Sequence, residues 1–343
     1  MAFQAARNTR GELIRDEKGD PVARKDAEEP PEEIARALAW IAKHSIKVTD
    51  LNDSDTLRRA LTALSMKLYG KKAAENTVRR KRSSFSNALR YAVERELLAS
   101  NPLSRVDWDP PATDDEVDFR YVPNPAPARA LLEAVRVQGQ RGGHLHGFFG
   151  CMYYAAMRPS EVAQLNKRDC KLPASGWGEL VLSQSRPEVG AGWTDDGKSY
   201  EIRGLKRRAR KTTRPVPIPP VLVALLRQHM ETYSPASDGR LFTAARGGRV
   251  RSTEYADIWQ QARKKALSAE EVATPLADVP YSLRHAGVSL WIKAGVDPAE
   301  VARRAGHSIA VLWKFYAKIL RGQEQRSNEL IDSALEADSQ DQE

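Results

Sequence analysis

Apolar residues recur at helical spacing along most of this chain. In the first third they predict helices over residues 30–41 and 54–69, and a longer helix that Asn76-Thr77 cap, with an apolar face of Val78, Phe85, Leu89, Ala92 and Val93. Further helices are expected over residues 127–138, 144–156, 219–233 and 252–267. Residues 179–219 carry strand signals instead, in the segments ELVLS, SYEIR and TRPVPIP. The pattern therefore predicts a mainly helical fold with a small β element.

The clearest helix signals lie in residues 279–320. Ser282 is expected to cap a helix that ends at Gly295. A second helix follows Asp297-Pro298-Ala299-Glu300, where a capping aspartate precedes proline and a glutamate stands three residues after the cap. That helix is expected to stop at Gly306, and Ser308 can cap a third.

The third helix carries Tyr316 and is expected to continue to about Ala334. Arg284 lies at the start of the first of these helices, and His307 lies in the break before the third. These three residues are thus near helix ends or on a short helix, where a fold can bring them together.

Composition divides the 343 residues into four segments. Residues 1–26 are polar and mixed in charge, which predicts a short N-terminal arm. Residues 27–105 are predicted to form a helical domain, and residues 106–126, rich in Pro and Asp, an interdomain linker. Residues 127–343 are expected to form a larger second domain with a C-terminal tail.

The net charge of +9 is unevenly distributed. Residues 67–95 hold nine Lys or Arg against two acids, residues 203–214 hold seven bases and no acid, and residues 329–343 hold six acids and no base. Clustered bases are typical of a nucleic-acid-binding face. A solvated helix and a solvated hairpin would have the same composition, so charge alone leaves the two interpretations open.

Several classes of protein are disfavoured. No run of 18 apolar residues exists, and the polar N-terminus lacks the apolar core of a signal peptide. Cys151 and Cys170 occur without a CxxC motif, which indicates reduced thiols rather than a zinc site or a disulfide. His144 and His146 have no further ligands nearby and are interpreted as structural. We expect a cytoplasmic protein with no metal, no cofactor and no membrane association.

An arginine, a histidine and a tyrosine together suit a phosphodiester. Its two non-bridging oxygens match the guanidinium fork, and a phenol can attack phosphorus and hold the product as a phosphotyrosine. A second arginine, Arg158, precedes Pro159 at the expected entrance of a helix, with Glu161 in the first turn. Two roles for Glu161 are open: a salt bridge that orients Arg158, or ordinary capping of the helix dipole.

The segments LRHAG and AGHS, followed by Tyr316, resemble the active-site core of the tyrosine recombinases of the phage-integrase type. His307 follows Arg284 by 23 residues and Tyr316 follows His307 by 9, and both spacings match the family pattern. The resemblance implies a helical, SAM-like core-binding domain at residues 27–105 and a catalytic domain with a small antiparallel β-sheet, an α+β fold. It also implies site-specific recombination of DNA through a 3′-phosphotyrosyl intermediate, without a cofactor.

The resemblance also implies roles for individual residues. Tyr316 would be the nucleophile, Arg158 and Arg284 would neutralise charge in the transition state, and His307 would donate a hydrogen bond to a non-bridging oxygen. The family usually has a histidine three residues before the second arginine, where this chain has Tyr281. A phenol can still hydrogen-bond the phosphate, but a pKa near ~10 makes it a poor proton shuttle at neutral pH.

His285 follows Arg284 directly. We expect its side chain to point elsewhere on the helix and to serve as a structural hydrogen-bonding residue.

The family delivers a catalytic lysine from the turn between its second and third strands. Here that turn, GLKRRARKTTRPVPIP, is longer than usual, so Lys206 is the preferred candidate and Lys211 the alternative. The other bases of the turn are expected to contact phosphates, as are those in the first turns of the helix after Asn76, since bases there oppose the helix dipole unless a phosphate compensates. The DNA-binding candidates are Arg79, Arg80, Lys81, Arg82, Arg207, Arg208, Arg210 and Lys211.

The partner that the resemblance implies is double-stranded DNA with specific recombination sites, held by four copies of the chain in a synaptic complex, with a directionality factor as a further candidate. Integration or excision of a mobile element or phage is the favoured role. Two alternatives are a type IB topoisomerase, which uses similar chemistry as a monomer, and a catalytically silent DNA-binding accessory protein. The helical N-terminal segment favours a recombinase over a topoisomerase.

Overall fold

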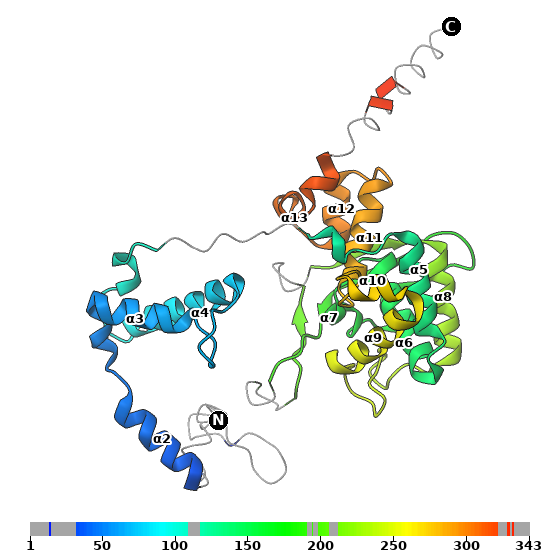
Figure 1. Cartoon of the computed structure of the whole chain (residues 1–343). Coiled ribbons are helices and arrows are strands. Elements are labelled where there is room, and N and C mark those ends of the chain that lie inside the picture. Colours follow the sequence, from blue (N-terminus) through cyan, green and yellow to red (C-terminus); the bar gives the residue numbers. More distant parts are fainter. Residues whose placement is uncertain are drawn as a thin grey trace. The chain divides into compact units, whose positions relative to one another are not determined.

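The computed structural model describes Ile14 and residues 32–108, 117–190, 194, 198–205, 212–321, 328–329 and 331–332. The chain divides into two compact units (Figure 1). Of the described residues, 32–108 belong to the first unit, and those from Val117 onwards, together with Ile14, belong to the second. Both are mainly helical, and the second contains a small antiparallel sheet, as the sequence predicts.

The first unit is small and mainly helical. It contains α2 (Glu32–His44), α3 (Ser54–Leu64) and α4 (Glu75–Glu94), with 3-10 turns at Val48–Asn52 and Pro102–Arg105. Its core gathers apolar residues from α3, α4 and the turns, namely Leu51, Leu57, Leu89, Ala92, Leu98, Leu103 and Val106. Of the apolar face expected on the long helix, Phe85, Leu89, Ala92 and Val93 contribute to this core, whereas Val78 is buried outside it.

The helix expected over residues 54–69 ends earlier, at Leu64. A tight hairpin follows, in which Met66 pairs with Lys72 and the Lys67 amide donates to the Lys71 carbonyl at 2.7 Å. Gly70 has a φ of +79°, a conformation that glycine adopts without strain. The turn therefore interrupts an otherwise helical pattern.

The helices of the second unit are short to medium in length. In the order of the chain they are α5 (Pro125–Arg136), α6 (Gly139–Tyr154), α7 (Pro159–Val162), α8 (Pro220–Thr232), α9 (Ser252–Ala266), α10 (Ala269–Ala273), α11 (Ser282–Lys293), α12 (Pro298–Ala305) and α13 (Ile309–Arg321), with 3-10 turns at Phe119–Tyr121 and Lys167–Asp169. Helix α6 is central, since Leu145, Phe148, Phe149 and Met152 are fully buried and α5, α8 and α11 all pack on it.

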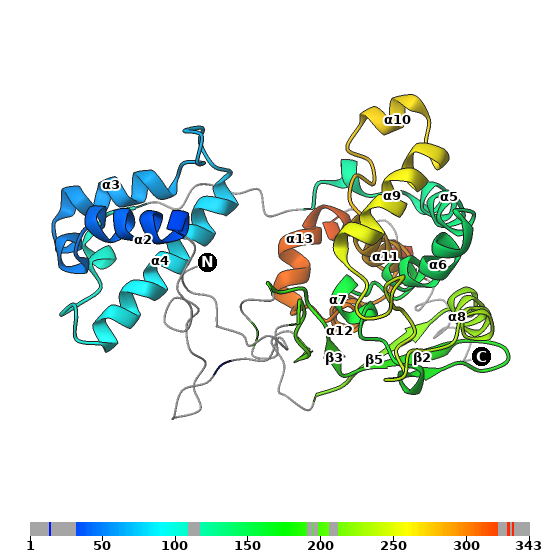
Figure 2. The same ribbon diagram turned by 90° about the horizontal axis from the view of Figure 1, so that it is seen from below.

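The sheet pairs strands in the order β1 (Cys170–Lys171), β2 (Gly178–Leu182) and β5 (Arg214–Ile218), with Leu180 opposite Val216. A separate ladder joins β3 (Gln184–Ser185) to β4 (Arg203–Gly204). The strand expected at residues 199–203 is thus mostly wrong: only its last residue lies in β4, and Tyr200 forms an isolated bridge to Glu188. In Figure 2, α12 lies beside β5, against which it packs.

The three C-terminal helices α11, α12 and α13 pack on one another. Asp297 caps α12 as predicted, accepting bonds from the amides of Ala299 and Glu300, and Gly306 ends it at a φ of +65°. Helix α11 begins at Ser282, with Tyr281 rather than Ser282 in the cap position. This segment turns the chain sharply at Gly306 and fixes where His307 lies.

Candidate active site

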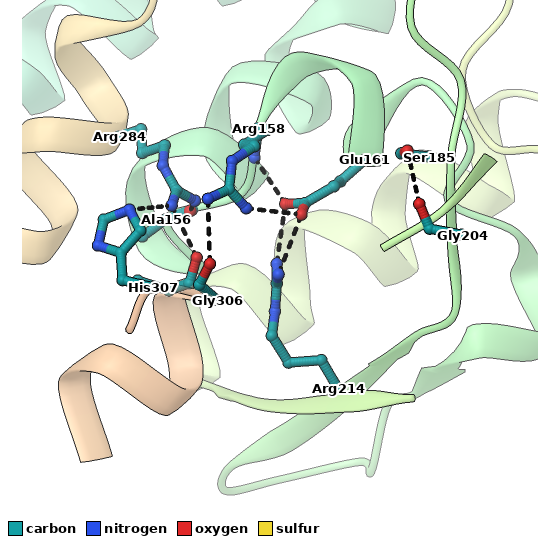
Figure 3. A network of polar contacts seen from close by, with 10 residues as sticks. Ala156, Arg158, Glu161, Ser185, Gly204, Arg214, Arg284, Gly306 and His307 are labelled. Carbon is teal, nitrogen blue, oxygen red and sulfur yellow. Dashed lines mark hydrogen bonds and ion pairs between the residues drawn. The ribbon is translucent and has the colours of Figure 1, made fainter. Parts of the chain in front are cut away.

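Two arginines from distant parts of the sequence lie together in the second unit. Arg158 stands at the N-terminus of α7, and Arg284 lies in the first turn of α11. Figure 3 shows their guanidinium groups beside each other, with His307 and Gly306 on one flank and Glu161 on the other. The structure therefore brings three of the expected catalytic residues, Arg158, Arg284 and His307, into one polar cluster.

Backbone carbonyls hold both guanidinium groups in place. Arg284 is 1% exposed and donates to the carbonyls of Ala156 and Ala305, the latter at 2.7 Å. Arg158 donates to the Gly306 carbonyl at 3.1 Å. Ala156 itself has a φ of +45°, a left-handed conformation that is strained for a residue with a side chain. The turn that carries Arg158 into the cluster is thus held in an unusual backbone geometry.

Glu161 is the anionic centre of the cluster and is 2% exposed. It accepts from the Arg158 amide at 2.9 Å and pairs with the Arg158 guanidinium at 3.0 Å, so both roles considered for it, helix capping and orientation of Arg158, are present at once. Arg214 donates two further bonds to it, at 3.0 and 2.8 Å. Burial alone would raise the pKa of Glu161, but the charge and hydrogen bonds of Arg214, with the charge of Arg158, hold that pKa at about 2.

Arg214 is a member of this polar cluster that the sequence reasoning missed. It is 1% exposed and lies in β5, whose residues alternate between buried and half-buried positions. The segment RPVPI places the arginine on the same face as the buried Val216 and Ile218. That alternation is a signal for an inward-pointing charge, which a buried carboxylate must accompany.

The geometry fixes the proton position on His307. Its Nε2 lies 2.8 Å from Arg284 Nη2, and because arginine only donates hydrogen bonds, Nε2 must be the acceptor. The proton therefore sits on Nδ1, which is buried and has no hydrogen-bond partner among the residues that the structure describes. Burial, with the charges of Arg284 and Arg158, lowers the pKa of His307 to about 3, so the ring is neutral at physiological pH.

Tyr316 lies in α13 and is 1% exposed. Its backbone departs from helical values (φ −125°, ψ 18°), so the helix kinks at this residue. Its ring lies 6.3 Å from the His307 ring, between centroids. Burial raises the pKa of the phenol well above its usual range, although the charge of Arg284 partly opposes this.

His285 does not point away from the site, contrary to the expectation from its position on the helix. Its Nδ1 lies 2.8 Å from the Tyr316 hydroxyl, which belongs to α13. Tyr281, one turn earlier on the same helix, packs edge-on against the His285 ring at 5.1 Å. The direction of His285 depends on how α13 packs on α11, and no local feature of the sequence reveals it.

The basic residues expected in the turn before β5 lie outside the described residues: Lys206, Arg207, Arg208, Arg210 and Lys211.

The basic residues of α4 separate into two groups. Arg79 and Arg82 line a surface hollow with Ser83, Ser86, Asn87, Arg90 and Trp108, and the Arg82 guanidinium stacks 4.0 Å from the Trp108 ring. Arg80 is exposed, whereas Lys81 donates at 2.8 Å to the Met66 carbonyl and so anchors the hairpin. Arg79, Arg82 and Arg90 thus form a basic stripe along this helix, the α4 stripe. Arg90 lies two turns beyond Arg82, the last of the DNA-binding candidates expected on this helix.

His144 and the two cysteines have structural surroundings. His144 receives a contact from Arg141 at 3.0 Å and packs among the rings of His229, Tyr233 and Phe242. No group of three or more potential metal-ligating side chains occurs in the part of the chain that the structure describes. Cys151 and Cys170 are free thiols. Of the described helices, none has the length and apolar character needed to cross a bilayer.

Comparisons of sequence and of structure both find tyrosine recombinases or integrases as similar proteins. No family model matches the chain. The chain is 25% identical over 270 residues to tyrosine recombinase XerC of Neisseria meningitidis, and the aligned residues cover 77% of this chain and 75% of the relative. It is 24% identical over 271 residues to tyrosine recombinase XerC of Neisseria gonorrhoeae.

Among solved structures, the integrase of transposon Tn1549 in complex with circular intermediate DNA matches at a TM-score of 0.56 and 16% identity, covering 87% of this chain and 94% of that one. The XerH site-specific recombinase bound to a palindromic difH substrate matches at a TM-score of 0.55 and 13% identity, over 82% and 72% of the two chains. The chain therefore has the fold of the tyrosine recombinases and resembles them in sequence, as its motifs predict.

Proposed function

We propose that this chain, similar to the tyrosine recombinases in sequence and fold, is a site-specific recombinase that cuts and rejoins DNA through a 3′-phosphotyrosyl intermediate. The observation that carries the proposal is the convergence of Arg158, Arg284, His307 and Tyr316, from α7, α11, the α12–α13 turn and α13, in one unit. The chemistry needs no redox group, since phosphoryl transfer exchanges one phosphodiester for another.

In the proposed mechanism Tyr316 attacks the scissile phosphorus and the 5′-oxygen leaves. Arg158 and Arg284 neutralise the charge that builds on the non-bridging oxygens, and groups already fixed in place supply such stabilisation most effectively. The carbonyl contacts and Glu161 provide that fixation. Lys206 is the proposed acid that protonates the leaving 5′-oxygen.

His307 is suited to bind the phosphate as a neutral donor. Its Nδ1–H has no partner among the described residues, while Arg284 occupies its Nε2. A neutral donor keeps the same hydrogen-bonding pattern across physiological pH because its pKa is held far below neutrality. Tyr281, half-buried at the start of α11, is proposed as an additional phosphate contact in place of the family's usual histidine.

DNA outside the reacting phosphate would be held by basic surfaces. The α4 stripe, with Arg79, Arg82 and Arg90, supports a backbone contact from the first unit. We further propose that four copies of the chain assemble on two duplexes in the cytoplasm, and that the reaction integrates or excises a mobile element, with a directionality factor as an additional partner. Solved structures of similar fold that are complexes with DNA support duplex DNA as the partner in this proposal.

The decisive experiment is covalent trapping. The protein is mixed with pooled DNA fragments from its own genomic neighbourhood, with chelator and no added metal, and SDS-resistant adducts are isolated and sequenced. We expect an adduct with the wild-type protein and with Tyr281→Phe, and none with Tyr316→Phe. An adduct that survives in Tyr316→Phe would contradict the assignment of the nucleophile.

The same experiment separates the alternatives. A catalytically silent binder would retain fragments without forming any adduct, and a type IB topoisomerase would form adducts spread over many sequences and relax supercoiled plasmid. A recombinase is expected to give adducts at one short sequence, and two copies of that sequence on a plasmid are expected to exchange strands.

A further inference from the structure

We propose that His285 is the base that accepts the phenolic proton of Tyr316 when the tyrosine attacks phosphorus, an inference that rests on the function proposed above. The observation is the 2.8 Å contact between His285 Nδ1 and the Tyr316 hydroxyl. It joins a reacting atom to a side chain that can take up a proton, across two packed helices.

The contact is well defined on both sides. Tyr316 is almost fully buried, and His285 Nδ1 is the hydrogen-bond partner of its hydroxyl in the described part of the chain. His285 lies one turn after Tyr281 on α11, and the Tyr281 ring packs against the imidazole edge-on at 5.1 Å. The ring is thus braced from its own helix while its Nδ1 faces α13.

The other groups near the phenol are poorly suited to accept its proton. His307 has its only acceptor nitrogen, Nε2, occupied by Arg284. Tyr281 is a phenol and cannot take a proton at neutral pH unless it has already lost its own. Arg284 and Arg158 only donate. Among the described groups around Tyr316, His285 alone combines contact with the hydroxyl and an available lone pair.

His285 is also in the protonation state that the role demands. Burial, followed by the charge of Arg284, lowers its pKa to about 4, so the ring is neutral at physiological pH and can hold its own proton on Nε2. A bound phosphodiester adds negative charge beside it, and this opposes the effect of Arg284. The imidazolium that forms during the attack is therefore better tolerated in the complex than in the free protein.

The step balances without any further reactant. The Tyr316 Oη–P bond forms and the P–O5′ bond breaks, while the Oη proton moves to His285 Nδ1. The 5′-oxygen receives its proton from a separate acid, for which Lys206 is the proposed residue. In the rejoining step the 5′-hydroxyl attacks phosphorus and returns its proton to Lys206, the P–Oη bond breaks, and His285 returns its proton to the departing tyrosine. This chain has Tyr281 where the family usually has a histidine, and in the proposed step the phenolic proton is accepted by His285, one turn further along the chain.

The test uses the DNA duplex identified by trapping and measures single-turnover cleavage by wild type, His285→Ala and His285→Asn. Asparagine places an acceptor near the position of Nδ1 but cannot take a proton. We expect both variants to cleave at least about 100-fold more slowly than wild type, the lower end of the usual contribution of general-base catalysis. A cleavage rate restored in His285→Asn would show that His285 only positions the tyrosine. A rate within about threefold of wild type in His285→Ala would show that His285 takes no part in the reaction. Either result overturns the proposal.

A second substrate tells which oxygen His285 serves. In a duplex with a bridging 5′-phosphorothiolate, sulfur leaves without needing a proton. We expect this substrate to restore cleavage by Lys206→Ala and to leave the His285→Ala defect unchanged. Restoration of His285→Ala would place His285 on the leaving-group side and overturn the proposal. Melting temperatures and DNA affinities of the variants show that they are folded and bind.

The two proposals fail in different ways. If wild type forms no adduct with any DNA, the recombinase function fails and the role of His285 fails with it. If wild type forms adducts and His285→Ala forms them equally fast, the function stands and the role of His285 alone is wrong.

Discussion

The buried pair Arg214–Glu161 makes a strong prediction about stability. Both side chains are at most 2% exposed, and Arg214 donates two bonds to the carboxylate, at 3.0 and 2.8 Å. Arg214→Met keeps most of the length of the side chain but removes its charge, so Glu161 is left buried with only Arg158 beside it. Removal of one partner from a buried pair typically destabilises by about 3–5 kcal/mol.

The depressed pKa of Glu161 gives a similar magnitude. A fall from the ordinary carboxyl value of 4.5 to about 2 corresponds to about 3 kcal/mol of stability at neutral pH, and Arg214 makes the largest favourable contribution to that fall. Because this pKa is depressed in the folded state, the contribution is present above pH 4.5 and is lost as the pH falls towards 2. The difference between wild type and Arg214→Met should therefore shrink over that interval.

Differential scanning calorimetry measures this effect, since it separates the transitions of the two units. At roughly 2–4 °C per kcal/mol for a domain of this size, the transition of the second unit is expected to fall by about 6–12 °C in Arg214→Met at neutral pH. Arg203→Met is the matched control, because Arg203 pairs with Glu201 on the surface, where both are about half exposed, and such pairs contribute about 0–1 kcal/mol. Equal shifts in the two variants would refute the reasoning.

Three other predictions follow from the described contacts. Gly287→Ala places a Cβ 2.0 Å from the Tyr153 carbonyl oxygen and should destabilise the protein by about 1–3 kcal/mol through the α6–α11 interface. In the control Gly150→Ala the added Cβ has no atom closer than 3.4 Å, so its melting temperature should lie within a degree or two of wild type. Equal melting temperatures for the two variants would contradict this packing. Arg90→Gln should weaken DNA binding and lower the slope of log affinity against log salt by about 1, and an unchanged slope would remove the α4 stripe from the interface. Burial lowers the pKa of His144 from 6.5 to about 3, so the free energy of unfolding should decline as the pH falls below 6.5. His144→Phe should make that decline less steep, and an unaltered pH dependence of stability would contradict this role.

The sequence predicts most of the helices because their signals are local. Asp297 caps α12 and Gly306 ends it as expected, since the cap needs only neighbouring amides and the left-handed end needs only glycine. The early end of α3 shows the limit of this reasoning. The periodicity continues past Leu64, but a hairpin that Lys81 anchors from α4 determines the chain's path there.

The active site divides in the same way between what spacing reveals and what packing decides. Arg158, Arg284, His307 and Tyr316 can be named from order and spacing in the sequence. Arg214 cannot be named in this way, because its partner Glu161 lies 53 residues earlier and the two side chains meet only in the folded chain. The direction of His285 depends equally on a residue of another helix, 31 positions later.

The carbonyls that hold Arg158 and Arg284 have a consequence for the protein before DNA binds. They belong to Ala156, just beyond α6, and to Ala305 and Gly306 at the end of α12, where helix dipoles present partial negative charge. Two guanidinium groups side by side repel each other, and these partial charges, with the Glu161 carboxylate, offset that repulsion. The pair of positive charges is therefore assembled in the free protein and does not need an anion to bring it together.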